Sequence, residues 1–204
     1  MNKSSYNLKK QPVQMRARAT VDFIKQAATH ILKEKGLSEF TTNHVAEKAG
    51  VSIGSLYQYF PSKEVLIAEI KRDHFAQLRV LIKNAYQENI DSTLDKIVEA
   101  FIVASIAAHQ IDPELHRILT GEWEDFKIKE DDNSQQSVRF VIEGLLNKYR
   151  SELRPNINIS LAAKLTYKVV ESMTHDTVLN QPQLLLEKDF VDEIKRMVMS
   201  YLKY

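Results

Sequence analysis

The sequence predicts an all-α fold, and three observations support this fold class. The 204 residues include only 5 Gly and 5 Pro, so turns should be few and the regular elements long. Apolar residues recur at the helical spacing of three and four along most of the chain. No segment shows the alternation that is typical of a half-buried strand. We therefore expect nine helices, three in a basic N-terminal unit and the rest in a larger bundle.

Composition narrows the class of protein. A hydrophobic share of 44% and a charged share of 27% are ordinary for a globular chain. The absence of Cys excludes disulfides, thiolate chemistry and Cys-containing zinc sites. The longest apolar run, residues 100–108, is too short to cross a bilayer, and the N-terminus has no apolar segment of the kind found in signal peptides. We expect a cytoplasmic protein that needs no cofactor.

The small net charge of +1 hides an uneven distribution. Residues 1–63 carry ten Lys and Arg against four Asp and Glu, whereas the remaining residues carry 18 against 23. This division indicates two working parts, of which the first faces a polyanion. The alternative is a solvated basic helix face that has no partner.

The first elements follow from amphipathic spacing and local stop signals. Residues 1–15 form a polar, basic stretch that we expect to be a flexible arm. A helix over residues 16–35 follows, because Ile24, Ala27, Ala28, Ile31 and Leu32 recur on one face. Gly36 comes directly after Lys35 and is a good C-terminal stop.

Two short helices come next. Thr41 is a suitable N-cap and Gly50 a suitable terminating residue, and they enclose about two helical turns. Ser52 can cap a second short helix that runs from residue 53 to 60. Pro61 disfavours helical geometry at the residue before it and should end that helix.

The rest of the chain predicts six longer helices. Ser62 can cap the first of them, Ser92 and Asp95 have the spacing of a capping box, and Asp112 before Pro113 is a strong helix start. Residues 129–136 (KEDDNSQQ) are expected to form a polar loop. The predicted helices cover residues 63–89, 92–110, 112–126, 138–149, 160–178 and 188–201.

Residues 41–60 have the pattern of a helix-turn-helix. Two short helices joined by a tight turn must pack closely, so their inner positions need small or apolar residues. Val45, Ala46 and Ala49 on the first helix and Leu56 on the second satisfy this need. Gly50 permits the positive φ angle that the sharp turn demands.

The outer side of the second short helix carries side chains that suit base edges. Ser55 and Gln58 can donate or accept hydrogen bonds, and Ile53 can contact a thymine methyl group. Gly54 removes bulk, so the backbone can approach a groove closely. A recognition helix presents its outer side and its N-terminal end in this way.

Hydroxyl and ammonium groups flank this outer face. Tyr57 and Tyr59 are two residues apart and so point to different sides, where each hydroxyl could contact a phosphate. Lys63 adds positive charge at a helix N-terminus. The alternative is an ordinary helical hairpin whose tyrosines pack as core. The candidate DNA-binding residues are Thr41, Thr42, Ser52, Ile53, Gly54, Ser55, Tyr57, Gln58, Tyr59 and Lys63.

Residues 41–66, TTNHVAEKAGVSIGSLYQYFPSKEVL, resemble the DNA-binding domain of the tetracycline-repressor-like (TetR) family of bacterial transcription regulators. His44 stands where that family often has an acid or Lys, so no role is assigned to it. The similarity covers roughly residues 16–70. The residues that carry it are Thr42, Val45, Ala46, Ala49, Gly50, Val51, Ser52, Leu56, Tyr57, Tyr59, Phe60, Lys63 and Leu66.

The resemblance implies a domain arrangement and a mechanism. It implies a helix-turn-helix DNA-binding domain over residues 16–62 and a ligand-binding and dimerisation domain over residues 63–204. The expected protein is a homodimeric regulator that binds a palindromic operator and is released by a small-molecule effector. Because most members of the family repress transcription, we expect a repressor. Dimer contacts are expected from residues 160–178 and 188–201, unless their apolar stripes are intramolecular core.

An effector pocket can be suggested only from residues that share helix faces. Aromatic groups with a few polar neighbours are typical of ligand pockets. The alternative is that these residues are plain core and surface. The candidates are Phe101, Ser105, His109, Trp123, Phe126, Tyr167, Glu171 and Thr174.

Two other classes of protein compete with a ligand-responsive regulator. The sequence lacks a Gly-rich phosphate loop, HExxH and G-x-S-x-G, so we expect no enzyme. His109, His116 and Glu122 could together hold a metal, although their spacing is not diagnostic and solvent-exposed His is the simpler interpretation. A DNA-binding or adaptor protein that responds to no ligand would instead have a solid bundle core.

Overall fold

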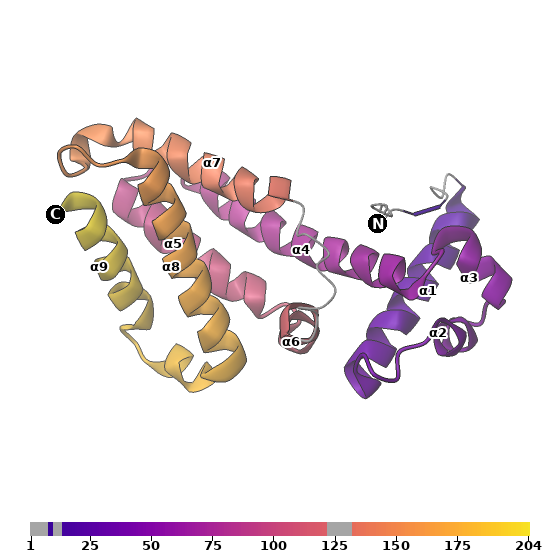
Figure 1. The fold of residues 1–204 in the computed structure, drawn as a ribbon. Coiled ribbons are helices and arrows are strands. Elements are labelled where there is room, and N and C mark those ends of the chain that lie inside the picture. The colour runs from indigo at the N-terminus through magenta and orange to yellow at the C-terminus, as the bar shows by residue number, and fades with distance from the viewer. Residues whose placement is uncertain (1–7, 10–13, 122–131) are drawn as a thin grey trace. The chain divides into compact units, whose positions relative to one another are not determined.

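The computed structural model describes residues 8–9, 14–121 and 132–204. Within these residues the chain forms nine α-helices and no strand, so the all-α prediction is confirmed (Figure 1). Two short 3-10 helices, η1 (Arg150–Glu152) and η2 (Pro182–Leu186), were not predicted. The α-helices are α1 (Met15–Lys35), α2 (Thr42–Lys48), α3 (Ile53–Tyr59), α4 (Lys63–Glu88), α5 (Leu94–His109), α6 (Pro113–Gly121), α7 (Asp132–Lys148), α8 (Ile159–Asn180) and α9 (Phe190–Lys203).

Most predicted caps are present in the structure. The side chains of Thr41 and Ser52 accept hydrogen bonds from backbone N–H groups in the first turns of α2 and α3. Ser62 does the same at the start of α4, where Val65 N–H donates to its Oγ at 3.4 Å. Gly36 and Gly50 both have φ of 66°, the left-handed region in which glycine is least strained. Local sequence signals therefore set these boundaries.

Two predicted boundaries were wrong. The N-cap of α5 is Thr93 and not Ser92, since the Thr93 side chain accepts from Lys96 N–H at 3.4 Å. The predicted loop over residues 129–136 was wrong for its second part, because α7 begins at Asp132. The polar residues 132–137 thus form the first turns of a helix whose apolar stripe begins only at Val138.

The chain divides into two compact units, of which the first contains the described residues of Met1–Ala76 and Glu114–Ile128. Its core joins α1, α2 and α3 with the first half of α4. Leu115 and Leu119 of α6 belong to this same core, although the sequence had suggested a place for them in the larger bundle. The N-terminal unit is therefore completed by α6, which follows residues 77–112 of the second unit in the sequence.

Polar contacts also hold α4 within the first unit. His74 Nε2 of α4 and His116 Nδ1 of α6 are hydrogen-bonded at 2.9 Å, and the two residues are only 3% and 1% exposed. Lys25 of α1 pairs with Asp73 of α4 at 2.7 Å. Burial acts to lower the pKa of the Lys25 ammonium, but Asp73 and Asp22 outweigh this effect and raise that pKa above its usual value.

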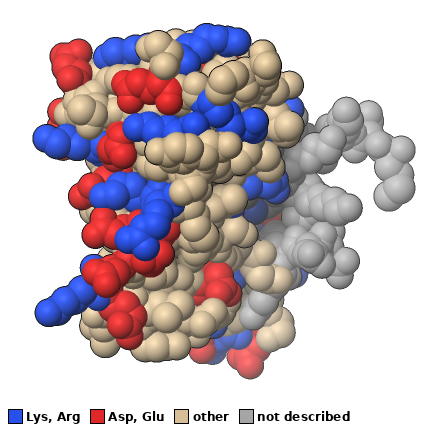
Figure 2. Space-filling model, turned by 90° about the vertical axis from the view of Figure 1, so that its left-hand side faces the viewer, with Lys and Arg blue, Asp and Glu red and all other residues tan. Residues whose placement is uncertain are grey.

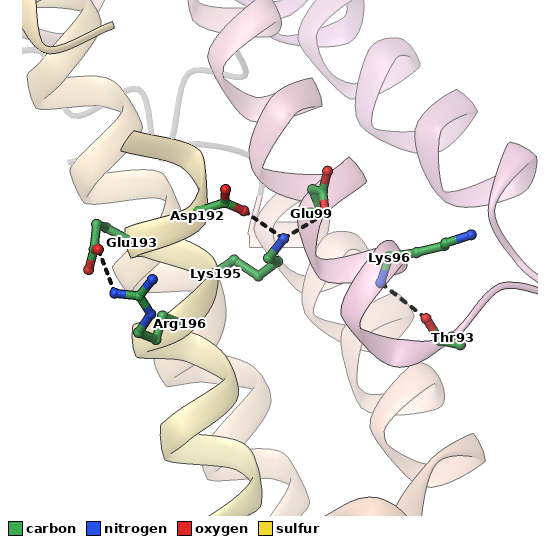
Figure 3. A network of polar contacts seen from close by, with 7 residues as sticks. All are labelled: Thr93, Lys96, Glu99, Asp192, Glu193, Lys195 and Arg196. Carbon is green, nitrogen blue, oxygen red and sulfur yellow. Dashed lines mark hydrogen bonds and ion pairs between the residues drawn. The ribbon is translucent and has the colours of Figure 1, made fainter. Parts of the chain in front are cut away.

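The second unit contains the described residues of Gln77–Pro113 and Lys129–Tyr204. Its apolar core draws on α5, α7, α8 and α9. Figure 3 shows an exposed ion-pair network where α5 meets α9, with the Lys195 ammonium 2.7 Å from both Asp192 and Glu99. Hydrogen bonds to Asp192 and Glu99 raise the pKa of Lys195, and the bond to Lys195 lowers the pKa of Asp192.

The surface drawn in Figure 2 carries both signs of charge. Acidic and basic groups are intermingled there and lie beside uncharged surface, so this face presents no single-sign field. None of the described helices combines the length and the apolar character that crossing a bilayer requires.

Candidate nucleic-acid interface and effector site

The α2–turn–α3 segment has the geometry expected of a helix-turn-helix. Val45 and Ala46 of α2 and Leu56 of α3 are buried in the core of the first unit. Phe60, the residue after α3, is also fully buried there. One face of α3 is thereby fixed against the core, and its opposite face is left to solvent.

The exposed face of α3 carries the predicted base-reading residues. Ile53, Gly54 and Gln58 are exposed, and Ser55 is half-buried. The Ser55 hydroxyl is 2.8 Å from the Ser52 hydroxyl, and Ser55 N–H donates to Ser52 Oγ at 3.1 Å. Ser52 and Ser55 therefore act together as a cap of α3 in the free chain. Gln58, by contrast, has a long polar side chain with no such hydrogen bond to the described residues.

The structure brings two candidate phosphate-binding hydroxyls together. The Tyr57 hydroxyl, on an exposed side chain, is hydrogen-bonded at 3.0 Å to Thr42 Oγ1 at the first position of α2. This bond spans the two helices of the motif and uses the proton of one of the two hydroxyls. The other hydroxyl keeps its proton and could donate it to a phosphate oxygen.

Tyr59 lies in a different environment from Tyr57. Its side chain is half-buried and packs against the core of the first unit, so it presents only part of its surface to solvent. Its carbonyl oxygen accepts from Lys9 N–H at 3.0 Å, a contact that no pattern in the sequence predicts. Thr41 and Lys63 are exposed at the N-terminal ends of α2 and α4.

Three of the candidate effector residues lie together in the second unit. Thr174 donates to Val170 O at 2.8 Å, so the Ser105 hydroxyl, 2.9 Å away, must donate to Thr174 Oγ1. His109 Nδ1 is 2.7 Å from Ser105 O, and since a carbonyl only accepts, Nδ1 carries the proton. Ser105, His109 and Thr174 are all buried.

His175 completes this polar cluster, although the sequence analysis did not single it out. Its ring meets the His109 ring edge-to-face with centroids 5.6 Å apart. Burial is the main cause that lowers the pKa of His109, and the neighbouring His175 lowers it further against the opposing effect of the Ser105 carbonyl. The cluster is thus a polar, hydrogen-bonded region between α5 and α8.

The remaining effector candidates are less closely grouped. Phe101 and Tyr167 are half-buried and pack against the apolar core of the second unit. Glu171 is half-buried on α8. Trp123 and Phe126 lie outside the described residues.

The described residues offer no set of ligands for a metal ion. No group of three or more His, Cys, Asp or Glu side chains among them is placed to hold one. His116 is bonded to His74, and His109 to a backbone carbonyl. Glu122, the third residue of the hypothetical metal site, lies outside the described part of the chain.

One helix of the second unit carries an exposed apolar stripe. Leu161, Leu165 and Val169 of α8 are 50%, 41% and 39% exposed and follow one another at intervals of four residues. The corresponding pattern on α9 is different, because Ile194 and Val198 are buried in the core of the unit. On α9, however, Met197 is 47% exposed, so part of that helix also presents apolar surface.

Comparison with protein families accounts for most of the chain. Residues 24–70 match the family described as "Bacterial regulatory proteins, tetR family". Residues 93–202, more than half of the chain, match "Tetracyclin repressor-like, C-terminal domain". The first match contains α2 and α3, and the second contains α5, α7, α8 and all but the last residue of α9.

Individual relatives are similar over part of their length. The chain is 36% identical over 98 residues to the nucleoid occlusion factor SlmA of Mannheimia succiniciproducens, which is 46% of this chain and 43% of that protein. It is 33% identical over 86 residues to the HTH-type transcriptional repressor KstR2 of Mycolicibacterium smegmatis, which is 41% of this chain and 40% of that protein. The chain thus spans less than half the length of these two relatives.

Similarity of fold extends further than similarity of sequence. The crystal structure of NalD, the secondary repressor of the MexAB-OprM multidrug efflux pump in Pseudomonas aeruginosa, superimposes with a TM-score of 0.71. That likeness covers 93% of this chain and 98% of NalD at 19% sequence identity, and so it bears on the fold alone. Together with the two family matches and the helix-turn-helix geometry of α2 and α3, these observations show that the chain belongs to the TetR family of helix-turn-helix transcription regulators.

Proposed function

We propose that this chain is a homodimeric repressor that binds a near-palindromic DNA operator and is released by a small-molecule effector. The observation that carries the proposal is the division of α3 into two faces. Leu56 is buried in the core, while the side chains of Ile53 and Gln58 are exposed to solvent. A surface of this kind suits the major groove of B-DNA.

Phosphate contacts would come from the edges of the same surface. The Thr42–Tyr57 hydroxyl pair and exposed Lys63 supply donors and positive charge. Because phosphates are alike at every base pair, these groups give affinity and salt dependence, and Ile53 and Gln58 give sequence preference.

Dimerisation through α8 would explain its exposed stripe. Three large apolar side chains, Leu161, Leu165 and Val169, stand on one face of a 22-residue helix. Exposed contiguous apolar surface of this sort is typical of protein–protein contacts. Two copies joined by such a face would present two reading helices, which fits an inverted-repeat operator.

The effector would bind beside the polar cluster of Ser105, His109 and Thr174. Burying hydroxyl and imidazole groups is costly unless they are hydrogen-bonded, and a wholly apolar core would avoid that cost. α4 belongs to both compact units, since the boundary between them falls after Ala76. A ligand that favours one setting of α4 would shift the equilibrium away from DNA binding.

A titration of labelled duplex DNA tests the proposed function. The full chain is added to a fluorescein-labelled 30-bp duplex, and anisotropy is followed from 50 to 200 mM salt. We expect binding that weakens steeply with salt, because Lys and Arg displace condensed counterions. A chain that leaves the anisotropy unchanged at 50 mM salt is no DNA-binding regulator.

The effector part of the proposal has its own test. A compound panel is screened for molecules that raise the melting temperature of the chain and reverse the anisotropy change. The variant Ser105→Ala should lose much of the response to such compounds while still binding DNA, since Ser105 belongs to the second unit and α3 to the first. An unchanged response would place the effector elsewhere.

A further inference from the structure

Lys9 contacts the end of α3, and the proposed function makes no use of this contact. Lys9 N–H donates to Tyr59 O at 3.0 Å. Tyr59 is the last residue of α3, and Phe60 after it has an extended conformation with φ −115° and ψ 95°. A carbonyl at a helix C-terminus lacks the partner that a continuing helix would supply, so this bond satisfies a group that would otherwise need water.

A side-chain contact strengthens the attachment. Leu8 is half-buried and packs against the core of the first unit, as does the half-buried side chain of Tyr59. The segment is thus fastened by one backbone bond and one apolar side chain. Lys9 itself has an exposed side chain. The attachment therefore leaves its ammonium group available at the C-terminal end of the reading helix.

We propose that Leu8 and Lys9 form a strap that places the Lys9 ammonium on a phosphate of bound duplex DNA next to the end of α3. In this arrangement Lys9 is the contact residue, and Leu8 with the Lys9–Tyr59 backbone bond is the positioning device. The inference rests on the proposed function, because it assumes that α3 lies against DNA. It adds a residue that the sequence placed in a flexible arm.

The chemistry of the segment favours duplex DNA as its partner. Lys9 is followed by Lys10, and residues 1–63 have six more basic than acidic side chains. The first turn of α1, which begins at Met15, contains no acidic residue that could neutralise them. The competing interpretation is that the strap only stabilises the fold by capping α3. In that case its positive charge would be dispensable.

Two substitutions of Lys9 distinguish the effect of its charge from the effect of its backbone hydrogen bond. Lys9→Ala removes the ammonium group and keeps the N–H that bonds to Tyr59. Lys9→Pro removes both. Lys35→Ala, at the exposed end of α1, removes the same charge from the same unit and is the matched control. Each full-length variant is titrated into the labelled 30-bp duplex over a salt series, and its melting temperature is recorded.

The strap predicts a specific order of effects. Lys9→Ala should weaken binding by about three- to tenfold and reduce the slope of log K against log salt by about 1, as loss of one phosphate contact does. Lys9→Pro should weaken binding by about as much as Lys9→Ala and with the same reduced slope, because the strap serves to place the ammonium group that both variants lack. Lys35→Ala should change affinity less than about twofold. If Lys9→Pro fails to fold, Leu8→Ala replaces it and should weaken binding and lower the slope by up to about 1, because a displaced Lys9 no longer meets its phosphate.

Two results would overturn the inference. The first is a Lys9→Ala variant with wild-type affinity and salt slope, which would leave the strap as a fold-stabilising cap. The second is a Lys35→Ala variant that loses as much affinity as Lys9→Ala, which would show a general effect of net charge. Failure of the wild-type chain to bind the duplex would instead remove the proposed function and the strap with it.

Discussion

At the scale of single residues, the environment of each polar group in α3 separates structural from functional roles. Ser52 and Ser55 bond to each other and so cap the helix, which a serine pair at this spacing does without any partner molecule. Gln58 is exposed, and its amide has no hydrogen bond to the residues that the structure describes. Sequence reasoning grouped these residues together because it could not see which donors were already satisfied.

Tyr57→Phe should weaken binding to all duplexes to a similar degree. It removes a hydroxyl that is bonded to Thr42 and is placed to donate to a phosphate. The loss of about 1 kcal/mol for one hydrogen bond corresponds to about fivefold in affinity. Gln58→Ala should instead change the relative affinities of different sequences. A Tyr57→Phe variant that altered base preference would show that the two roles are assigned wrongly; competition between duplexes in gel shifts measures both.

Gly54→Ala should stabilise the free chain and impair DNA binding. A methyl group at Gly54 would have only Ser52 Oγ nearby, at 3.9 Å, so the fold has room for it. Alanine in a helix is favoured over glycine by about 0.5–1 kcal/mol, so the free energy of unfolding should rise. Affinity for DNA should fall about tenfold or more if the backbone lies close to the groove. Unchanged affinity would mean that no close approach occurs.

At the scale of elements, α6 is the least expected part of the structure. The spacing of Leu115, His116 and Leu119 predicts an amphipathic helix, but it does not indicate whether that helix packs in the core of the first or of the second unit. The caps at Thr41, Ser52 and Ser62 were predictable because they act within one helical turn. Thr93 replaced Ser92 as a cap because neighbouring hydroxyl residues suit that role equally well.

The His74–His116 bond should contribute strongly to the stability of the first unit. His116→Leu removes one partner of a buried hydrogen bond, which costs about 1–3 kcal/mol. The double variant His74→Leu/His116→Leu should cost less than the two single changes together, because both polar groups are then gone. Urea unfolding followed by circular dichroism gives the three free energies. Additive losses would show that the two imidazoles do not depend on each other.

At the scale of the whole molecule, an apolar helix stripe can be either buried core or exposed surface. Both α8 and α9 have apolar residues at helical spacing, and only the packing shows that Ile194 and Val198 are intramolecular core while Leu161 and Leu165 are exposed. Periodicity reports that a helix face is apolar and not what covers it. The helix-turn-helix was identifiable because its caps, turn and spacing are local, whereas the effector residues come from separate helices.

Leu165→Asp should convert a dimer into monomers. A carboxylate in the middle of the α8 stripe would be desolvated in an apolar contact, which is costly. Val103→Asp is the control, because Val103 is a similarly exposed apolar residue of α5 outside this stripe. Sedimentation analysis should show monomers for Leu165→Asp and dimers for the control and the parent chain. Dimers in all three would exclude the α8 stripe as the contact.

Enrichment of random duplexes by the full chain, followed by sequencing of the bound fraction, would decide whether paired copies of α3 read DNA. Two reading helices related by a two-fold axis predict an inverted repeat whose half-sites are centred about 34–36 Å apart, or one turn of B-DNA. Gln58→Ala should change bases within both halves equally. Recovery of a single unrepeated site, or of sequences that the Gln58→Ala variant selects unchanged, would contradict the proposed reading face.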